Sequence, residues 1–186
     1  MQELIKKIEQ WAEDRNIING SKPIDQAMKL FSEFGELADN VGKGRDCRDD
    51  IGDVFVVLTI ICKHVGKSIS EVKIKYHYID QENKYSVYDI MHELCSFIDH
   101  VESGWLDSGS LGSVLSLLQN IAYIIDATLE ECVQIAYNDI KDRKGVMYNG
   151  VFIKESDPAY QDILDNIEAD KRMATQKRVS VNIEDL

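Results

Sequence analysis

Five acidic residues flank a glycine-containing turn in the first third of the chain, and a solid apolar run follows them directly. They are Glu33, Glu36, Asp49, Asp50 and Asp53. Carboxylates that leave water repel one another and lose hydration, so they persist beside a buried segment only where something compensates their charge. The sequence therefore indicates a compensated acidic site at the start of the apolar run.

Helical spacing sorts four of these carboxylates into two pairs. A helix turns by about 100° per residue, so residues i and i+3 lie on one face. On this count Glu33 and Glu36 share a face of one helix, and Asp50 and Asp53 share a face of the next. The short turn makes the two helices antiparallel neighbours, so we expect the two pairs to face each other.

Four converging carboxylates need a hard cation. Oxygen-only ligation with room for water and phosphate suits Mg²⁺ or Mn²⁺. Two other interpretations stay open: a solvated acidic face, and a di-iron carboxylate bundle. The di-iron architecture uses Glu-x-x-His pairs, and no histidine lies three residues after Glu33 or Asp50.

The elements around this site are expected to be helical, which makes the predicted class all-α. Apolar residues at helical spacing predict helices over 3–15, 25–38, 48–66, 87–101, 111–125 and 129–144. The β-branched run in 48–66 favours a strand on propensity alone, but its helical neighbours and its acidic i, i+3 start favour a central helix. An Asn-Gly pair predicts a small hairpin in 146–154, and residues from 155 onward are expected to form an arm or a frayed tail.

Composition limits the partners. Lys plus Arg number 21 and Asp plus Glu 33, for a formal charge of −12, which argues against a binder of nucleic-acid polymers. The four cysteines form no CxxC pair, as expected in a reducing compartment. The charged, amphipathic N-terminus is unlike a signal peptide, and the longest apolar run is too short to cross a bilayer. These features predict a cytoplasmic protein without a membrane partner.

Two segments together resemble the MazG-like family of all-α nucleoside-triphosphate pyrophosphohydrolases. They are KLFSEFGELADNVGKGRDCRDDIGDVFVVL and, much later, LEECVQIAYNDIKDRKGVMYNGVFIK. The family pattern is ExxE on one helix and ExxD on the next, and these carboxylates hold the catalytic magnesium. Glu33 and Glu36 match the first pair and Asp53 matches the last position, while Asp50 stands where the family usually has Glu.

The resemblance covers residues 25–66 and 127–154, and the N-terminal helix more loosely. It implies a four-helix-bundle-like core within a domain of residues 1–154, with two inserted helices in a helical insertion at about 70–126. The charged tail over 155–186 lies outside the resemblance. The resemblance also implies Mg²⁺-dependent hydrolysis of a nucleoside triphosphate, expected to be a deoxynucleotide, to the monophosphate and pyrophosphate.

In the implied reaction a metal-bound or metal-oriented water cleaves between the α- and β-phosphates. Either Glu33 or Glu36 could orient that water. The resemblance further implies a homo-oligomer, with a dimer expected. The helices at 3–15 and 48–66 are apolar enough to need cover from a second subunit, or else from the two inserted helices.

Candidate phosphate contacts lie on the last predicted helix. Within AYNDIKDRKG, the residues Asn138, Lys141 and Lys144 fall on one helical face with Tyr137 and Gln134, and Arg143 points well away. The alternative is an ordinary helix C-terminus, where cations are favoured by the macrodipole. The resemblance implies that Asn and Lys or Arg of this helix bind phosphates.

Further polar candidates lie on the helix of Glu33. Gln26 and Lys29 share its face, so Gln26 could bind a base edge and Lys29 a phosphate. Trp11 could stack on a base, although its spacing is typical of a core residue.

A second metal site and a second function are also open. His92, Cys95 and Asp99 lie near one helical face and could suggest zinc, but without a second ligand pair an exposed helix face is favoured. The rival function is a catalytically silent helical module that binds a nucleotide or a partner protein. Asp50 in place of Glu and the long insertion leave room for it.

Overall fold

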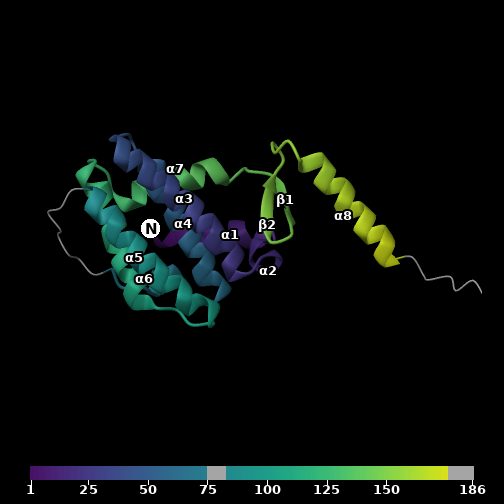
Figure 1. Ribbon diagram of the computed structural model, residues 1–186, viewed down its shortest axis with the longest axis horizontal. Helices are drawn as coiled ribbons and strands as arrows, with labels where there is room; N and C mark the ends of the chain where they lie inside the picture. The colour runs from purple at the N-terminus through teal and green to yellow at the C-terminus, as the bar shows by residue number, and fades with distance from the viewer. Residues whose placement is uncertain (75–82, 176–186) are drawn as a thin grey trace, which may run out of the picture.

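The computed structural model describes residues 1–74 and 83–175, and within them the chain is all-α with one small hairpin (Figure 1). The elements are α1 (Gln2–Asp14), α2 (Ile17–Gly20), α3 (Pro23–Lys43), α4 (Arg48–His64), a 3-10 helix η1 (Ile69–Glu71), α5 (Asn83–Glu102), α6 (Ser108–Ile124), α7 (Leu129–Ile140), β1 (Gly145–Tyr148), β2 (Val151–Lys154) and α8 (Tyr160–Thr175). The predicted fold class is confirmed. Part of the polar segment at 70–86 and the end of the expected tail lie outside the described residues.

Helix α4 is the centre of the bundle. Helices α7, α3, α1 and α6 all pack against it, and apart from Asp53 every residue from Ile51 to Cys62 is buried. A helix that is apolar on all sides is one that neighbours cover on all sides. This explains why a β-branched run folds as a helix here, as predicted.

Gly52 sets the closest of these contacts. A Cβ at this position would collide with the backbone carbonyl of Cys132 and with the side chain of Ala136, both on α7. The absence of a side chain lets α4 and α7 approach at backbone distance. The acidic start of α4 is thereby held close to α7.

Of the two inserted helices, α6 packs directly against the central helix, and α5 packs against α6 and α3. Helix α6 also packs against α7. Asn120 on α6 donates a hydrogen bond of 3.2 Å to the hydroxyl of Ser86 on α5, inside the buried contact. The inserted helices thus supply part of the cover predicted for 48–66, and the homo-oligomer stays a prediction.

Three predicted helix boundaries are wrong by four or five residues, and one of them is the start of α5, which lies at Asn83 rather than residue 87. Helix α3 runs to Lys43 rather than residue 38, and Gly44 ends it with a left-handed φ of 65°. Helix α7 ends at Ile140 rather than at residue 144. The carbonyl of Ile140, at the end of α7, accepts a hydrogen bond of 2.8 Å from the Trp11 indole on α1.

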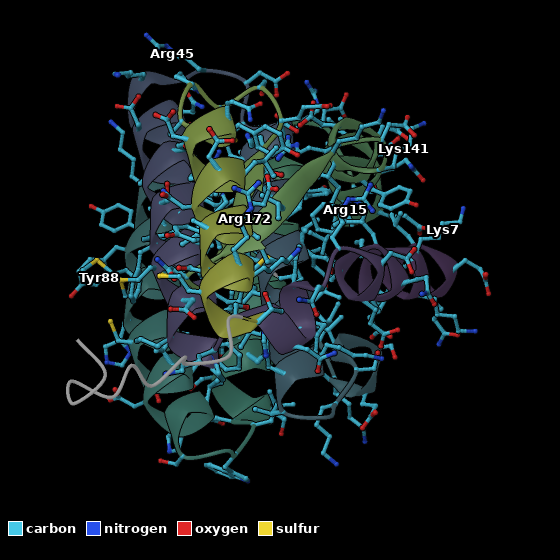
Figure 2. The ribbon with its side chains drawn as sticks, turned by 90° about the vertical axis from the view of Figure 1, so that its right-hand side faces the viewer. Lys7, Arg15, Arg45, Tyr88, Lys141 and Arg172 are labelled. Atoms are coloured by element: carbon cyan, nitrogen blue, oxygen red, sulfur yellow. The ribbon has the colours of Figure 1, made fainter. Side chains whose placement is uncertain are left out.

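Arg15 completes this termination. Its guanidinium donates to the backbone carbonyl of Lys141 at 2.9 Å and to that of Arg143 at 2.8 Å. The Arg15 guanidinium carbon also lies 4.9 Å from the centre of the Trp11 ring. Figure 2 shows Arg15 and Lys141 on the same side of the molecule. Residues 141–144 therefore follow a course set by α1, not by the register of α7.

The predicted hairpin is confirmed. Strands β1 and β2 pair antiparallel from Gly145 opposite Lys154 to Tyr148 opposite Val151. Asn149 and Gly150 both have positive φ, of 48° and 82°, as the two-residue turn requires.

Helix α8 follows the hairpin and projects away from the bundle (Figure 1). It is a regular helix of 16 residues, none of which is buried. The expected arm is thus helical as far as the structure describes it. In the described ranges no single helix is long and apolar enough to cross a membrane, and α6 with α7 reach that length and composition only as a pair bent by 94°.

Candidate functional site

Glu33 on α3 and Asp53 on α4 form the centre of the candidate site. Both line one pocket. Glu33 is only 7% exposed, and its carboxylate is paired with the ammonium of Lys29 one turn earlier. Burial raises the pKa of Asp53 to about 7, and the charges of Glu33 and Asp49 add to this effect, against Lys29 and Arg143. This part of the predicted convergence is present.

Asp49 belongs to the same acidic group, although the i, i+3 pairing left it out. Burial raises its pKa first, followed by the charges of Asp139, Asp50 and Glu33, and Arg143 opposes them. Asp49 lies four residues before Asp53, and residues at i and i+4 also share a helix face. The i, i+4 spacing from Asp53 is the sequence signal that places Asp49 in the acidic group.

Asp50 is held by a different partner. The side-chain amide of Asn40 on α3 donates to its carboxylate at 2.8 Å. Burial raises the pKa of Asp50, this hydrogen bond lowers it, and the charge of Glu33 raises it again. Glu33 therefore acts electrostatically on all three aspartates at the start of α4.

Glu36 is exposed and makes no hydrogen bond or ion pair within residues 1–74 and 83–175. It is not among the residues that line the pocket. In the same two ranges, no group of three or more Asp, Glu, His or Cys side chains is arranged to hold a metal ion. Of the predicted pairs, the structure brings together one member of each, Glu33 and Asp53.

The pocket has a volume of about 380 Å³ and two chemically different parts. Its charged and polar lining includes Gln26, Lys29, Glu33, Asp53, Arg143 and Lys154. Its apolar lining includes Trp11, Ile17, Val56, Val57, Ile60 and Phe152. The Trp11 and Phe152 rings meet edge to face, with centroids 6.2 Å apart. Such a cavity suits a ligand with one anionic part and one flat, less polar part.

Gln26 and Lys29 line this pocket, as their place on the face of Glu33 predicted. Gln26 is 7% exposed, and its amide nitrogen donates to the hydroxyl of Ser21 at 3.0 Å. The Ser21 hydroxyl in turn donates to the carbonyl of Ile17 at 2.7 Å. In this network the amide nitrogen of Gln26 points to Ser21, whose hydroxyl oxygen also lies 3.3 Å from Nε2 of His64.

The expected orientation of Arg143 was wrong. Its side chain is 25% exposed, lines the pocket and pairs with the carboxylate of Asp139. Lys141 and Lys144 are exposed and lie outside the pocket lining. The reason is the early end of α7, after which the backbone no longer follows the helical register that placed the two lysines together.

Two other polar residues, Asn138 and Lys154, lie in different surroundings. Asn138 is exposed, and its side-chain oxygen accepts a hydrogen bond from Gln134 at 3.1 Å. Lys154, which the sequence did not single out, reaches the pocket from the end of β2. Its position depends on how the hairpin docks, and no spacing rule within the helices gives that.

The remaining candidates from the sequence are Trp11 and the group of His92, Cys95 and Asp99. Trp11 is a buried core residue as well as a wall of the pocket. His92, Cys95 and Asp99 are all exposed on α5.

Comparison with known proteins adds a single kind of information. No family model matches the chain, and no solved structure matches it. A protein of Haemophilus phage HP1 (strain HP1c1), described as an uncharacterized 18.2 kDa protein in the rep-hol intergenic region, is 46% identical over 76 residues. That match covers 39% of this chain and 47% of the phage protein, so the chain spans about half the length of this relative. The name of the phage protein carries no activity.

Proposed function

We propose that this protein hydrolyses a nucleoside triphosphate to the monophosphate and pyrophosphate, with Mg²⁺ or Mn²⁺ as cofactor. The observation that carries the proposal is the half-buried Asp53 beside the buried Glu33, with its pKa raised to about 7. A carboxyl group in that condition at neutral pH is incompletely compensated by the protein alone. A divalent cation would supply the missing positive charge.

The chemistry of the donors fits such a cation. Glu33, Asp49 and Asp53 offer only carboxylate oxygens, which are the ligands that hard cations take. Asp50, held by Asn40, would orient a ligand or a water. Glu36 stays in the proposed set because of the family pattern. Bound there, Mg²⁺ would polarise phosphoryl oxygens and help to generate the attacking hydroxide.

The chain's own cations would hold the phosphates. Lys29, Arg143 and Lys154 line the same pocket as the carboxylates, and they come from α3, from the segment after α7 and from β2. Lys29 is paired with Glu33. A metal ion that neutralised Glu33 would release Lys29 toward a phosphate, which links metal binding to substrate binding.

The apolar part of the pocket would take the base and sugar. Gln26 lines the same pocket, and since its amide nitrogen is directed to Ser21, its carbonyl oxygen is the atom left to accept a hydrogen bond. We therefore propose Gln26 as a base contact. The phosphate roles of Asn138, Lys141 and Lys144 remain predictions from the family pattern, and their exposure makes them secondary to Arg143.

One observation favours the rival function, a silent helical module that binds a nucleotide or a partner protein. The carboxylate of Glu33 already has an ion-pair partner in Lys29, so half of the acidic centre is compensated without a metal. A pocket of this kind could bind a nucleotide through its cations and never cleave it.

Pyrophosphate release from a panel of nucleoside and deoxynucleoside triphosphates separates the two functions. We expect release with Mg²⁺ or Mn²⁺ and none after chelation. Nucleotide binding by calorimetry without turnover in either metal would establish the binding module instead.

We further propose a cytoplasmic homo-oligomer that contacts neither a membrane nor a nucleic-acid polymer. All four cysteines are free, and three of them, Cys47, Cys62 and Cys132, are buried, which suits a reducing compartment. The net charge of −12 disfavours a polyanionic partner.

A further inference from the structure

The hydroxyl of Ser21 lies where α2 ends, and groups from three helices converge on it. Its oxygen is 2.7 Å from the carbonyl oxygen of Ile17 on α2. It is also 3.0 Å from the amide nitrogen of Gln26 on α3 and 3.3 Å from Nε2 of His64, the last residue of α4. Gln26 and Ile17 both line the pocket, so this polar contact lies directly behind the pocket wall.

The number of protons at Ser21 sets the direction of each hydrogen bond. Two oxygens 2.7 Å apart need a proton between them, and the carbonyl of Ile17 has none, so the Ser21 hydroxyl proton lies on that contact. The Ser21 oxygen therefore accepts from its other two neighbours. Gln26 donates from its amide nitrogen and His64 from Nε2. A Gln26 amide turned over would bring its oxygen against the Ser21 oxygen with no proton between them.

His64 can make this donation as a neutral ring. It is half-buried, and burial lowers its pKa, against the charge of Asp25, so the ring is uncharged at neutral pH. A neutral imidazole has one N–H, and the contact with Ser21 puts that proton on Nε2. With the proton on Nδ1 instead, Nε2 would draw the hydroxyl proton of Ser21 away from Ile17. The tautomer of His64 thus supports the orientation of Ser21.

We propose that Ser21, supported by His64, is a positioning residue that sets the base selectivity of the pocket by holding the Gln26 amide in one of its two orientations. An amide that turns over exchanges an acceptor for a donor at the same place. With its nitrogen held by Ser21, Gln26 offers its oxygen. The site then takes a nucleobase with an N–H group on the contacted edge and rejects one with a carbonyl there. The inference rests on the proposed function, in which Gln26 contacts the base.

The burial of Gln26 gives this orientation its effect on affinity. Gln26 is 7% exposed, so an oxygen that faces a base carbonyl cannot turn to water instead. A buried polar atom without a partner lowers affinity by about fivefold or more. A site built on such a hydrogen bond rejects the wrong partner more strongly than an apolar wall does.

The experiment compares nucleotides that differ by an amino and a keto group. The probes are the α,β-methylene analogues of dCTP and dUTP, and of dATP and dITP, which resist cleavage between the α- and β-phosphates. Calorimetry with the full chain and Mg²⁺ gives their Kd values. Within the pair that binds more tightly, we expect the wild type to prefer one member by about fivefold or more.

Variants of Ser21 test the cause of that preference. Ser21→Ala should reduce the ratio of the two Kd values to about two or less, because both amide orientations are then available. Ser21→Thr keeps the hydroxyl and should keep the preference. Ser113→Ala on α6 is the matched control and should also keep it. The Ser113 hydroxyl donates to the carbonyl of Gly109, four residues earlier, as Ser21 does to Ile17.

Proton–nitrogen NMR of the wild-type chain tests the network without a nucleotide, and so does not depend on how well a variant folds. We expect the proton of the neutral His64 ring on Nε2. A proton on Nδ1 would overturn the proposal, and so would a Ser21→Ala chain that keeps the wild-type preference while nucleotides are still bound and cleaved. No binding of any analogue would overturn the proposed function together with this inference. Binding with the expected preference, but no pyrophosphate release from the natural nucleotides, would overturn the hydrolysis alone and support the role of Ser21.

Discussion

Glu33 and Asp53 lie on adjacent helices and line one pocket, and the charge of Glu33, after burial, is the largest contribution that raises the pKa of Asp53 to about 7. The contact between α3 and α4 holds these two groups in place through apolar neighbours such as Leu37 and Ile51. The packing of α3 on α4 therefore holds the carboxyl groups of Glu33 and Asp53 where they repel each other. It follows that metal, pH and charge removal at this pair should all be visible in stability as well as in activity.

The first prediction concerns pH in the absence of metal. Because the folded-state pKa of Asp53 lies above its usual 3.8, the folded chain keeps a proton that the unfolded chain has released. Asp53 therefore costs stability as pH rises from about 4 to about 7, and the cost is constant above that. Asp53→Asn should be more stable than wild type at pH 8 in a chelator, and the difference should shrink at pH 4. Urea unfolding at the two pH values measures it, and a difference that is the same at both pH values would contradict the assignment.

The second prediction is a metal effect on the same measurement. A ligand that binds only the folded state raises its stability. We expect millimolar Mg²⁺ to raise the melting temperature of the wild type and to have little effect on Glu33→Gln or Asp53→Asn. Both variants should lack pyrophosphohydrolase activity while keeping their helical circular dichroism. Ca²⁺ in place of Mg²⁺ and a Lys6→Gln variant on the exposed side of α1 serve as controls.

The third prediction tests Glu36, the carboxylate that the structure leaves exposed and without an ion pair in the described residues. If the family pattern holds, Glu36→Gln abolishes turnover and leaves the melting temperature in chelator unchanged, because no folded-state contact is lost. We expect this result. Near-normal turnover in Glu36→Gln, together with a loss in Asp49→Asn, would replace Glu36 by Asp49 in the metal site.

Sequence periodicity was sufficient for the bundle because the determining signal is local. The apolar residues of α1, α5 and α6 repeat at helical spacing, and the elements lie where that spacing predicts, within a few residues. Even the β-branched α4 follows, once its neighbours are known to be helical. The i, i+3 count also placed Gln26, Lys29 and Glu33 correctly on one face.

Sequence periodicity failed where a distant segment decides the backbone. Helix α7 has no glycine or proline before Gly145, so its pattern alone extends the helix to residue 144. Trp11 and Arg15, about 130 positions earlier, bind the carbonyls that end it at Ile140. The position of Arg143 in the pocket follows from that tertiary contact, and so could not be read from its own helix.

The last prediction follows from the corrected positions of Arg143, Lys141 and Lys144. Arg143 lines the pocket, whereas Lys141 and Lys144 are exposed outside it, so Arg143→Ala should be the most damaging of the three alanine substitutions. A charge-assisted contact is worth about 1.5–3 kcal/mol, and each ~1.4 kcal/mol is a factor of ten. We therefore expect a ten- to hundredfold loss in kcat/KM for Arg143→Ala and a smaller loss for the two lysines. Arg15→Ala should lower kcat/KM as well, although Arg15 does not line the pocket, because it removes the hydrogen bonds that position residues 141–143. Equal losses for Arg143 and Lys141, with no effect of Arg15→Ala, would mean that α7 continues in register in the active protein.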